Sequence, residues 1–261
     1  MTDDQTNARI MELRETMKGY TALDGELLSD QAAGVSRPPD GNTMAAETEI
    51  SLPRAFADRV PARSLVELLE TRASRRRFSD VPLPLEDLSF LMWATQGVRK
   101  TAARPGGTML RTVPSAGARH PLETYLLVHR VAGLEPGLYQ YLPSGHRLAR
   151  NRSVENAADR IAEATLGQVF MGSAAVDFIW TVVPYRSEWR YVTKAQKYAL
   201  LDAGHVCQNL YLACEAIGCA TCAVGAYDQE RMDTLLGLPS GPSCADDDEF
   251  VVYMAAVGWP V

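Results

Sequence analysis

The sequence predicts an α+β fold, and three observations lead to that class. Short apolar runs of strand length, such as Val176–Val183, are bounded by residues that favour turns. Longer stretches carry apolar residues at helical spacing, above all the one from about Tyr191 to Ile217. The two kinds of segment do not follow the regular β-α-β order of a parallel sheet, so an α+β arrangement is expected.

Helices are expected in the main body of the chain wherever apolar spacing and end signals coincide. Ser64 and Glu67 have the spacing of a capping box, and the leucines that follow share one helical face. Gly97 and Gly218 stand where glycine commonly ends a helix. One expected helix begins at Ser64, and the others span Leu85–Gln96, Val154–Leu166, Tyr191–Ile217 and Gln229–Leu236.

Strands are expected where residues that favour extended backbone gather. The run GLYQYLPSGHRLA predicts two short strands around a Pro-Ser-Gly turn. Val176–Val183 is apolar almost throughout, which is typical of a central strand buried on both faces. The remaining expected strands are Glu123–Val131, Ala220–Val224 and Phe250–Val257.

The first part of the chain differs from the rest. Residues 1–60 are polar and rich in proline, with only a short helical stretch near Ile10–Met17. Such a segment buries too little apolar surface to form its own core. We therefore expect an extended N-terminal arm over residues 1–60 and one folded domain over residues 61–261, with the arm wrapping the domain.

Composition limits the classes of partner. The net charge of −6 argues against nucleic acid, because phosphate binding usually needs a basic surface. No apolar run is long enough to cross a membrane, and the N-terminal residues lack a secretory pattern. The five cysteines form an odd set, which suits free thiols in a reducing cytoplasm better than a disulfide framework.

Several common catalytic motifs are missing from the sequence. No G-x-G-x-x-G follows an expected strand, and no Walker A loop or G-x-S-x-G occurs. A Rossmann dehydrogenase, a P-loop enzyme and a serine hydrolase of the usual kind are therefore not indicated.

The first stretch that could carry chemistry is Thr71-Arg72-Ala73-Ser74-Arg75-Arg76-Arg77-Phe78-Ser79. Arginine presents forked donors that match a phosphate group, and Ser74 adds a hydroxyl. A solvated run of charge is an equally good interpretation of this stretch taken alone.

The second stretch is Val113-Pro114-Ser115-Ala116-Gly117-Ala118-Arg119-His120-Pro121, just before an expected strand. Its small residues would let backbone N–H groups approach a flat or anionic ligand closely. The competing interpretation is a tight connecting loop without a ligand.

The third stretch is Gly218–Tyr227, which holds a C-x-x-C pair formed by Cys219 and Cys222. A structural zinc site would need a second pair of ligands at suitable spacing, so we expect no metal and interpret the cysteines as small buried residues. Gly225 and Ala226 are more suggestive, because small residues at a strand end can present backbone N–H groups to a ligand.

Taken together and in this order, the three stretches resemble the nitroreductase-like flavoenzyme family. The finer resemblance is to its SagB-type branch, which includes dehydrogenases that oxidise azolines in modified peptides. That branch is resembled in PSAGARHPLE, in GLYQYLPSGHRL, and in LDAGHVCQNLYLACEAIG followed by TCAVGAYD. The resemblance covers about Ser64 to Pro260.

The resemblance implies a fold and an assembly. It implies a nitroreductase-like fold, with a central, mostly antiparallel mixed sheet flanked by helices and a long central helix at a dimer interface. It further implies a homodimer that binds FMN at that interface, with both subunits contributing to each site.

The resemblance also implies roles for individual residues. Arg72 matches the arginine that holds the FMN phosphate, Ser74 a hydroxyl beside it, and Arg76 a basic residue near the pyrimidine edge of the flavin. In the family, one loop reaches the flavin from the partner subunit. The residues that match this loop are Pro114, Ser115, Ala116 and Gly117. Gly225 and Ala226 match the pair whose backbone faces flavin N5.

Two departures from the family pattern bear on function. Relatives often carry a basic residue near the C-terminus for the phosphate, but no Lys or Arg follows Arg231 here, and Arg119 could compensate. Azoline-oxidising relatives use a Lys-Tyr pair where this chain has Arg190-Tyr191, and arginine is a poor base because it stays protonated.

The leading hypothesis is an FMN-dependent oxidoreductase in which hydride passes from NAD(P)H through flavin N5 to an electron-poor small molecule such as a nitro compound or quinone. The donor leaves before the acceptor binds, and Arg190 with Tyr191 lines the acceptor pocket. One alternative is an azoline-oxidising dehydrogenase of a modified-peptide pathway. Another is a protein that holds flavin or binds a partner without catalysis, because a fold alone does not fix a function.

Overall fold

The computed structural model describes residues 3–20, 27–41, 44–56, 59–102, 108–239 and 246–261. Its centre is a seven-stranded sheet with the strand order β1-β6-β5-β4-β7-β9-β8. Each pair of neighbouring strands is antiparallel, and parallel pairing is limited to isolated bridges such as Ser74 with Thr221. The strands are β1 (Thr48–Ser51), β4 (Leu122–Val128), β5 (Gly137–Leu142), β6 (Arg147–Arg152), β7 (Val176–Val182), β8 (Ala220–Val224) and β9 (Phe250–Gly258).

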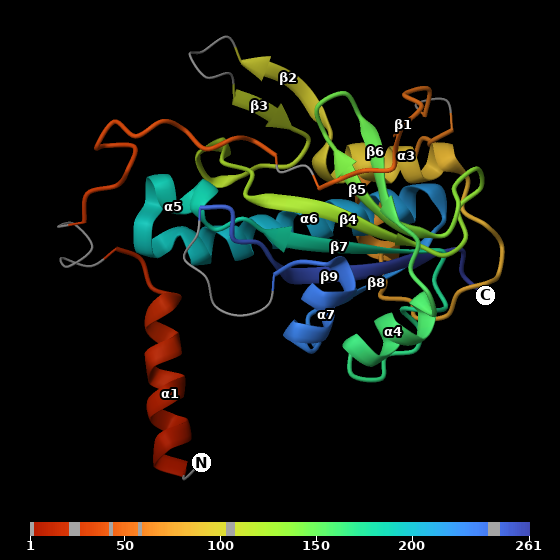
Figure 1. Ribbon diagram of the computed structural model, residues 1–261. Helices are drawn as coiled ribbons and strands as arrows, with labels where there is room; N and C mark the ends of the chain where they lie inside the picture. Colours follow the sequence, from red (N-terminus) through yellow and green to blue (C-terminus); the bar gives the residue numbers. More distant parts are fainter. Residues whose placement is uncertain (1–2, 21–26, 42–43, 57–58, 103–107, 240–245) are drawn as a thin grey trace.

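The central strand is β7, which lies between β4 and β9 and is buried along its whole length. Its side chains alternate between two hydrophobic cores, so Trp180 packs on one face of the sheet and Ile179 on the other. The Trp180 core lies beneath the helices α3 (Leu85–Gln96) and α6 (Ala195–Ile217). The Ile179 core lies beneath α4 (Ala157–Ala164) and α7 (Gln229–Leu236), on the opposite face (Figure 1). The prediction of a buried central strand is confirmed.

The long helix is shorter at its start than the sequence predicts. A separate helix, α5 (Tyr185–Tyr191), ends where the backbone of Val192 adopts a φ of +48°, and α6 begins only at Ala195. A positive φ is unusual for a β-branched residue, and apolar spacing gives no sign of it. The predicted end is correct, because Gly218 caps α6 in the left-handed conformation.

Some elements were not predicted, and others have different limits. The hairpin of β2 (Val98–Ala102) and β3 (Thr108–Arg111) lacks an apolar alternation that would signal strands. The helix α2 (Leu65–Thr71) begins after the Ser64 cap as expected. Against the predicted ranges, α4 loses residues at both ends, and β4 ends at Val128 instead of Val131.

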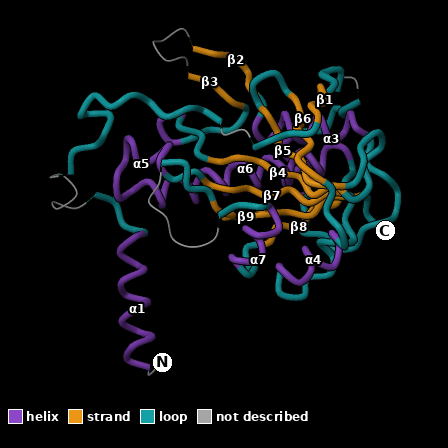
Figure 2. Tube along the Cα trace, in the orientation of Figure 1, coloured by secondary structure: helices purple, strands orange, loops and turns teal. Residues whose placement is uncertain are grey.

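The N-terminal arm contributes structure of its own. Its helix α1 (Asp3–Thr16) projects away from the domain, and residues 27–41 run past α5 (Figures 1 and 2). Gln31 N donates to Trp189 O at 2.9 Å, and Trp189 Nε1 donates to Val35 O at 3.0 Å, so the arm is bonded to α5. The strand β1 then pairs with β6 at the edge of the sheet.

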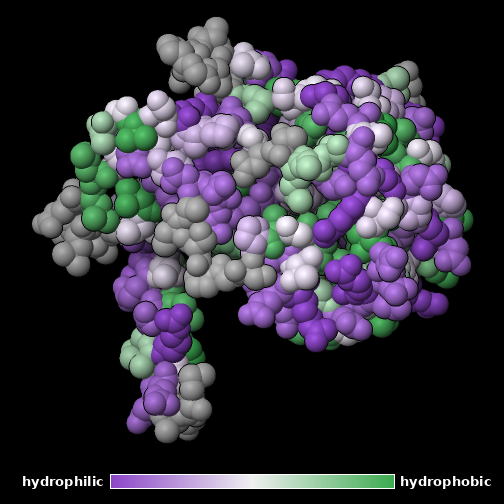
Figure 3. Space-filling model, in the orientation of Figure 1, coloured by the Kyte–Doolittle hydropathy of each residue, from purple (hydrophilic) through white to green (hydrophobic). Residues whose placement is uncertain are grey.

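The surface of the arm is partly apolar. Figure 3 shows hydrophobic side chains gathered on the arm near α5, and Leu27, Leu28 and Val35 are exposed there. Within the described residues, none of the helices has the length and hydropathy that crossing a membrane requires.

A buried histidine joins the sheet to α3. His146 is 1% exposed, and its ring nitrogens lie 2.8 Å from Ser89 Oγ and 2.7 Å from Tyr141 Oη. Burial, followed by the charge of Arg54, lowers the pKa of His146 to about 4. The neutral ring is thus the form that the folded protein stabilises.

This lowered pKa predicts an acid-sensitive fold. The unfolded chain takes up a proton at His146 near the ordinary pKa of 6.5, whereas the folded chain does so only near 4, so stability falls as the pH drops through that window. The loss amounts to about 1.4 kcal/mol per pH unit for this residue. Urea unfolding at one protein concentration, at several pH values between 7 and 4.5, measures it. In a folded His146→Gln variant, the free energy of unfolding should fall less steeply as the pH drops from 6.5 to 4.5, by the same amount of about 1.4 kcal/mol per pH unit. Parallel pH profiles for the two proteins would contradict the prediction.

Candidate functional site

The arginine-rich stretch lies alongside the edge strand β8. The helix α2 ends at Arg72, whose backbone N–H donates to Leu68 O, and the chain then turns toward the sheet. Ser74 forms a parallel bridge with Thr221, and Arg75 N donates to Thr221 O at 2.9 Å. These backbone contacts fix the position of the arginine and serine side chains relative to β8.

The arginines of this stretch have different surroundings. Arg75 forms an ion pair with Glu215 at 2.7 Å. Burial raises the pKa of Glu215, but bonds from Arg75 and Thr71 and the charge of Arg63 lower it more, so the net pKa is below its ordinary value. Arg75 is therefore a structural residue that ties the stretch to the end of α6.

Arg72 and Arg76 instead contact aromatic rings. The Arg72 guanidinium lies 5.3 Å from the centre of the Tyr211 ring, and that of Arg76 lies 5.9 Å from the Phe170 ring. Among the described residues, no carboxylate lies within ion-pair distance of either guanidinium. Both cations are therefore available to an anionic ligand.

Tyr211 of α6 links this group together, although sequence reasoning did not single it out. Its hydroxyl lies 2.9 Å from Ser74 Oγ and accepts a hydrogen bond of 2.9 Å from Ala223 N. We call Arg72, Ser74, Arg76 and Tyr211 the Arg72 cluster. Arg76 lies at the same place, because the Cys222 thiol is within hydrogen-bonding reach of Arg76, Tyr211 and Ser74. Two guanidinium groups without carboxylate partners and a serine hydroxyl form a donor set that suits a phosphate.

Gly225 and Ala226 follow directly after β8. A Cβ built on Gly225 would meet the Tyr253 ring at 3.7 Å, an ordinary contact, so packing within this chain does not require glycine there. Ala226 O accepts a hydrogen bond of 3.0 Å from Gln168 Nε2, and Gln168 lies on the same loop as Phe170. The strand end, this loop and the Arg72 cluster are therefore neighbouring parts of one region.

The Pro114–Gly117 loop lies in a second region. Ala116 N donates to Asp202 Oδ1 of α6 at 3.2 Å, and His120 N donates to Ser115 Oγ at 2.8 Å. Burial raises the pKa of Asp202, while bonds from Ser115 and from the Ala116 N–H oppose that rise. The loop is thereby held against the buried side of α6.

The same loop contacts the end of α5. Gly117 has a φ of +56°, and a Cβ built there would lie 2.5 Å from Tyr191 Oη and 3.2 Å from Arg190 Cδ. A side chain at this position would have to displace the Tyr191 and Arg190 side chains, and it would also strain a backbone with positive φ, so both features favour glycine. We call the loop residues Pro114 to Gly117, together with Arg190 and Tyr191, the Tyr191 cluster.

The two clusters lie at different places on α6. Asp202, which holds the Tyr191 cluster, and Tyr211, which holds the Arg72 cluster, are about 13 Å apart along the helix axis and about half a turn apart around it. The structure therefore brings each predicted group of site residues together, but within one chain it keeps the two groups apart.

Arg119 does not join the Arg72 cluster. Its guanidinium is buried 4.7 Å from the centre of the Trp189 ring, and Nε donates to Arg186 O at 2.7 Å. Burial, followed by the charge of Arg37, lowers the pKa of Arg119 to about 10. The idea that this residue supplements phosphate binding therefore finds no support in the geometry.

The two cysteines of the C-x-x-C pair are buried, as the sequence predicts. Cys219 and Cys222 flank Ala220 and Thr221 at β8, and burial raises the pKa of both thiols. Across the described part of the chain, no group of three or more His, Cys, Asp and Glu side chains is arranged to hold a metal ion.

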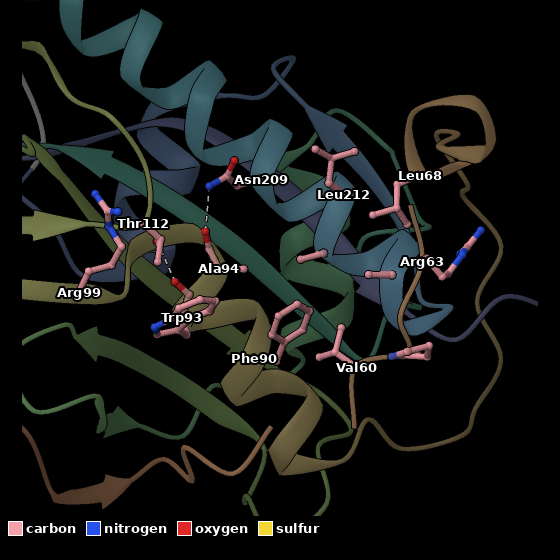
Figure 4. A pocket seen from close by; sticks show the side chains of 13 residues that line it. Val60, Arg63, Leu68, Phe90, Trp93, Ala94, Arg99, Thr112, Asn209 and Leu212 are labelled. Atoms are coloured by element: carbon pink, nitrogen blue, oxygen red, sulfur yellow. Dashed lines mark hydrogen bonds between the residues drawn. The ribbon is translucent and has the colours of Figure 1, made fainter. Parts of the chain in front are cut away.

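A groove of about 450 Å³ lies between α2, α3 and α6 (Figure 4). Phe90, Trp93 and Leu212 give it a mostly apolar lining, with Arg63 and Arg99 toward its ends. Asn209 Nδ2 donates to Ala94 O at 2.9 Å and bonds α6 to α3 along the groove. Leu65, Val66 and Leu69 of the adjacent α2 are exposed, which extends the apolar surface.

Comparison with known proteins places these features in a family. The family model described as "Nitroreductase family" matches residues 69–259, a range that contains both clusters. The chain belongs to the nitroreductase family. It is 35% identical over 196 residues to the "Putative nitroreductase MJ1384" of Methanocaldococcus jannaschii, a match that covers 75% of this chain and 91% of that protein.

Two further similarities lie among peptide-processing systems. The Trifolitoxin-processing protein TfxB of Rhizobium leguminosarum bv. trifolii is 32% identical over 117 residues, which cover 43% of this chain and 31% of that protein. A chain of the E. coli microcin synthetase McbBCD complex has the same fold, with a TM-score of 0.57 and 16% identity. That match covers 98% of this chain and 94% of the other. The nitroreductase fold and the nearness to the SagB-type branch are confirmed.

Proposed function

We propose that this nitroreductase-family oxidoreductase binds FMN and transfers hydride from NAD(P)H to an electron-poor acceptor such as a nitro compound or a quinone. The observation that supports FMN most directly is the Arg72 cluster, where two guanidinium groups without carboxylate partners lie beside the Ser74 hydroxyl. This donor set fits a phosphate monoester, and the small residues after β8 leave room for a flat ring.

Each residue of this region has a proposed role in binding. Arg72 and Ser74 would hold the phosphate, and Arg76 would lie near the pyrimidine edge, where a cation stabilises negative charge on the reduced ring. The backbone of Gly225 and Ala226 would face N5. When bound, FMN supplies the hydride chemistry, so the protein's task is to orient the cofactor and its substrates.

The Tyr191 cluster is the proposed acceptor site. The Tyr191 hydroxyl lies against Gly117 and can donate a hydrogen bond, and the exposed Arg190 can attract an anionic acceptor or the phosphate of a nicotinamide nucleotide. An arginine is a poor general base, so neither half-reaction is expected to use Arg190 in that role.

We further propose that the active unit is a homodimer. One chain keeps its two clusters apart, and a second copy could bring its Tyr191 cluster to the Arg72 cluster of the first. The exposed apolar side chains of α2 and the groove beside them supply a surface that a second copy would cover. On α6 itself, Leu200 and Leu201 are also exposed.

A second candidate is oxidation of azolines in a modified peptide. The similarity to the Trifolitoxin-processing protein favours it, as does the match of the microcin synthetase chain over almost the whole length, including the arm. Arg190 in place of a lysine weighs against it, because this chemistry would need a base.

The purified protein is expected to be yellow and to lose its flavin absorbance when NADH or NADPH is added without oxygen. Adding a quinone or a nitro compound should then restore the absorbance. If an azoline peptide bleaches the flavin and both nicotinamide nucleotides fail, the second candidate replaces the first. A protein that takes up no FMN when it is supplied would overturn both.

Multi-angle light scattering of the FMN-loaded protein is expected to give twice the mass of the chain. A site shared between two subunits requires an extensive and stable interface. A monomer that keeps its full FMN content would show that each chain holds a complete site.

Tyr191→Phe is expected to change turnover with some acceptors and to leave the FMN content unchanged. The substitution removes one hydroxyl from the acceptor side, so reduction by NAD(P)H should continue. Stopped-flow reduction and steady-state rates with several quinones and nitro compounds separate the two half-reactions. Unchanged rates with every acceptor would exclude a substrate role, and loss of FMN would show that Tyr191 belongs to the cofactor site.

A further inference from the structure

The Tyr211 hydroxyl is the meeting point of three separate parts of the chain. Tyr211 belongs to α6, Ser74 to the stretch after α2, and Ala223 to β8. Both contacts of the hydroxyl measure 2.9 Å, which is within the normal range for a hydrogen bond.

The direction of these hydrogen bonds follows from the donors available. A backbone N–H can only donate, so Tyr211 Oη accepts from Ala223 N. The phenol has one proton of its own, and Ser74 Oγ at 2.9 Å can accept it. In that arrangement the Ser74 proton points away from Tyr211. The Cys222 thiol also lies within hydrogen-bonding reach of Ser74 and Tyr211, but its sulfur is a much weaker acceptor than a phosphate oxygen.

The ring of Tyr211 has a second role. The Arg72 guanidinium lies 5.3 Å from its centre, within the range of a cation–π contact. One side chain thus contacts both groups that the proposed function assigns to the phosphate.

We propose that Tyr211 is a positioning residue for the FMN phosphate, an inference that rests on the proposed function. Its hydroxyl orients the Ser74 proton toward a phosphate oxygen, and its ring holds the Arg72 guanidinium in place. Tyr211 does not touch the ligand itself, so its effect is confined to the part of FMN that riboflavin lacks.

The experiment compares FMN with riboflavin, which has the same ring system without the phosphate. The Kd of each is measured by flavin fluorescence with apoprotein of the Tyr211→Phe variant, which keeps the ring and loses the hydroxyl. The Kd for FMN is expected to rise about 3- to 10-fold, the effect of one lost hydrogen bond. The Kd for riboflavin is expected to stay within about twofold. Equal changes for both ligands, or no change for either, would overturn the proposal.

A double-mutant cycle tests the route through Ser74. If Tyr211 acts by orienting the Ser74 proton, Tyr211→Phe adds little to the loss already caused by Ser74→Ala. If the fold-increases in the Kd for FMN of the two single variants instead multiply in the double variant, that route is contradicted. Tyr139→Phe in the distant strand β5 is the matched control, because it also removes a tyrosine hydroxyl that is hydrogen-bonded to the backbone, in this case by donating to Glu135 O at 2.7 Å. Tyr139→Phe should leave the ratio of the Kd for FMN to the Kd for riboflavin unchanged.

Arg72→Ala separates this inference from the proposed function. It should weaken FMN binding strongly, whereas Arg77→Ala, which removes an exposed neighbouring cation, should have little effect. If Arg72→Ala binds FMN as the parent does, the phosphate site itself is misplaced and the proposed function loses its main support. If Arg72→Ala weakens FMN binding and Tyr211→Phe does not, only the role of Tyr211 is wrong.

Discussion

The packing of α6 against one face of the sheet is the interaction on which the rest of the structure depends. The buried side of this helix is built from small residues such as Ala203, Cys207 and Cys214, which lie in the same core as Trp180. Small side chains let the helix approach the sheet closely, and large ones from β7 fill the space between them. From this fixed helix, Asp202 holds the Pro114–Gly117 loop and Tyr211 holds the stretch after α2. The relative position of the two clusters is therefore set by a single rigid element.

Much of the fold could be predicted because the signals are local. The apolar run of β7, the limits of α3 and the glycine that ends α6 all follow from neighbouring residues. The strand β1 and the hairpin of β2 and β3 gave no such signal, because their pairing depends on partners that a single polar segment does not reveal. The break at Val192 was hidden for a related reason, since its positive φ is imposed by the surrounding structure.

In the candidate site, too, some residues could be found from the sequence and others only from the fold. The resemblance named Arg72, Ser74 and Gly225 from their order along the chain, and the structure groups the first two with Tyr211 of α6, beside β8. Tyr211 itself lies 137 residues from Ser74, and nothing in its own neighbourhood marks it. The arginine run also illustrates the limit of composition. Adjacent residues Arg75 and Arg76 have different tasks, because only Arg75 faces Glu215. Which cation is structural is decided by the fold.

The contact between Gly117 and Tyr191 has a consequence for how such a protein can change over generations. A methyl group at position 117 would lie 2.5 Å from the present position of the Tyr191 hydroxyl, so a side chain at 117 would displace that hydroxyl. A lineage that acquires a side chain at 117 therefore moves or loses the hydroxyl at 191, and with it the contact that this group makes with whatever it recognises. The two positions should therefore be inherited as a pair, and related chains with other residues at 117 should differ at 191 as well.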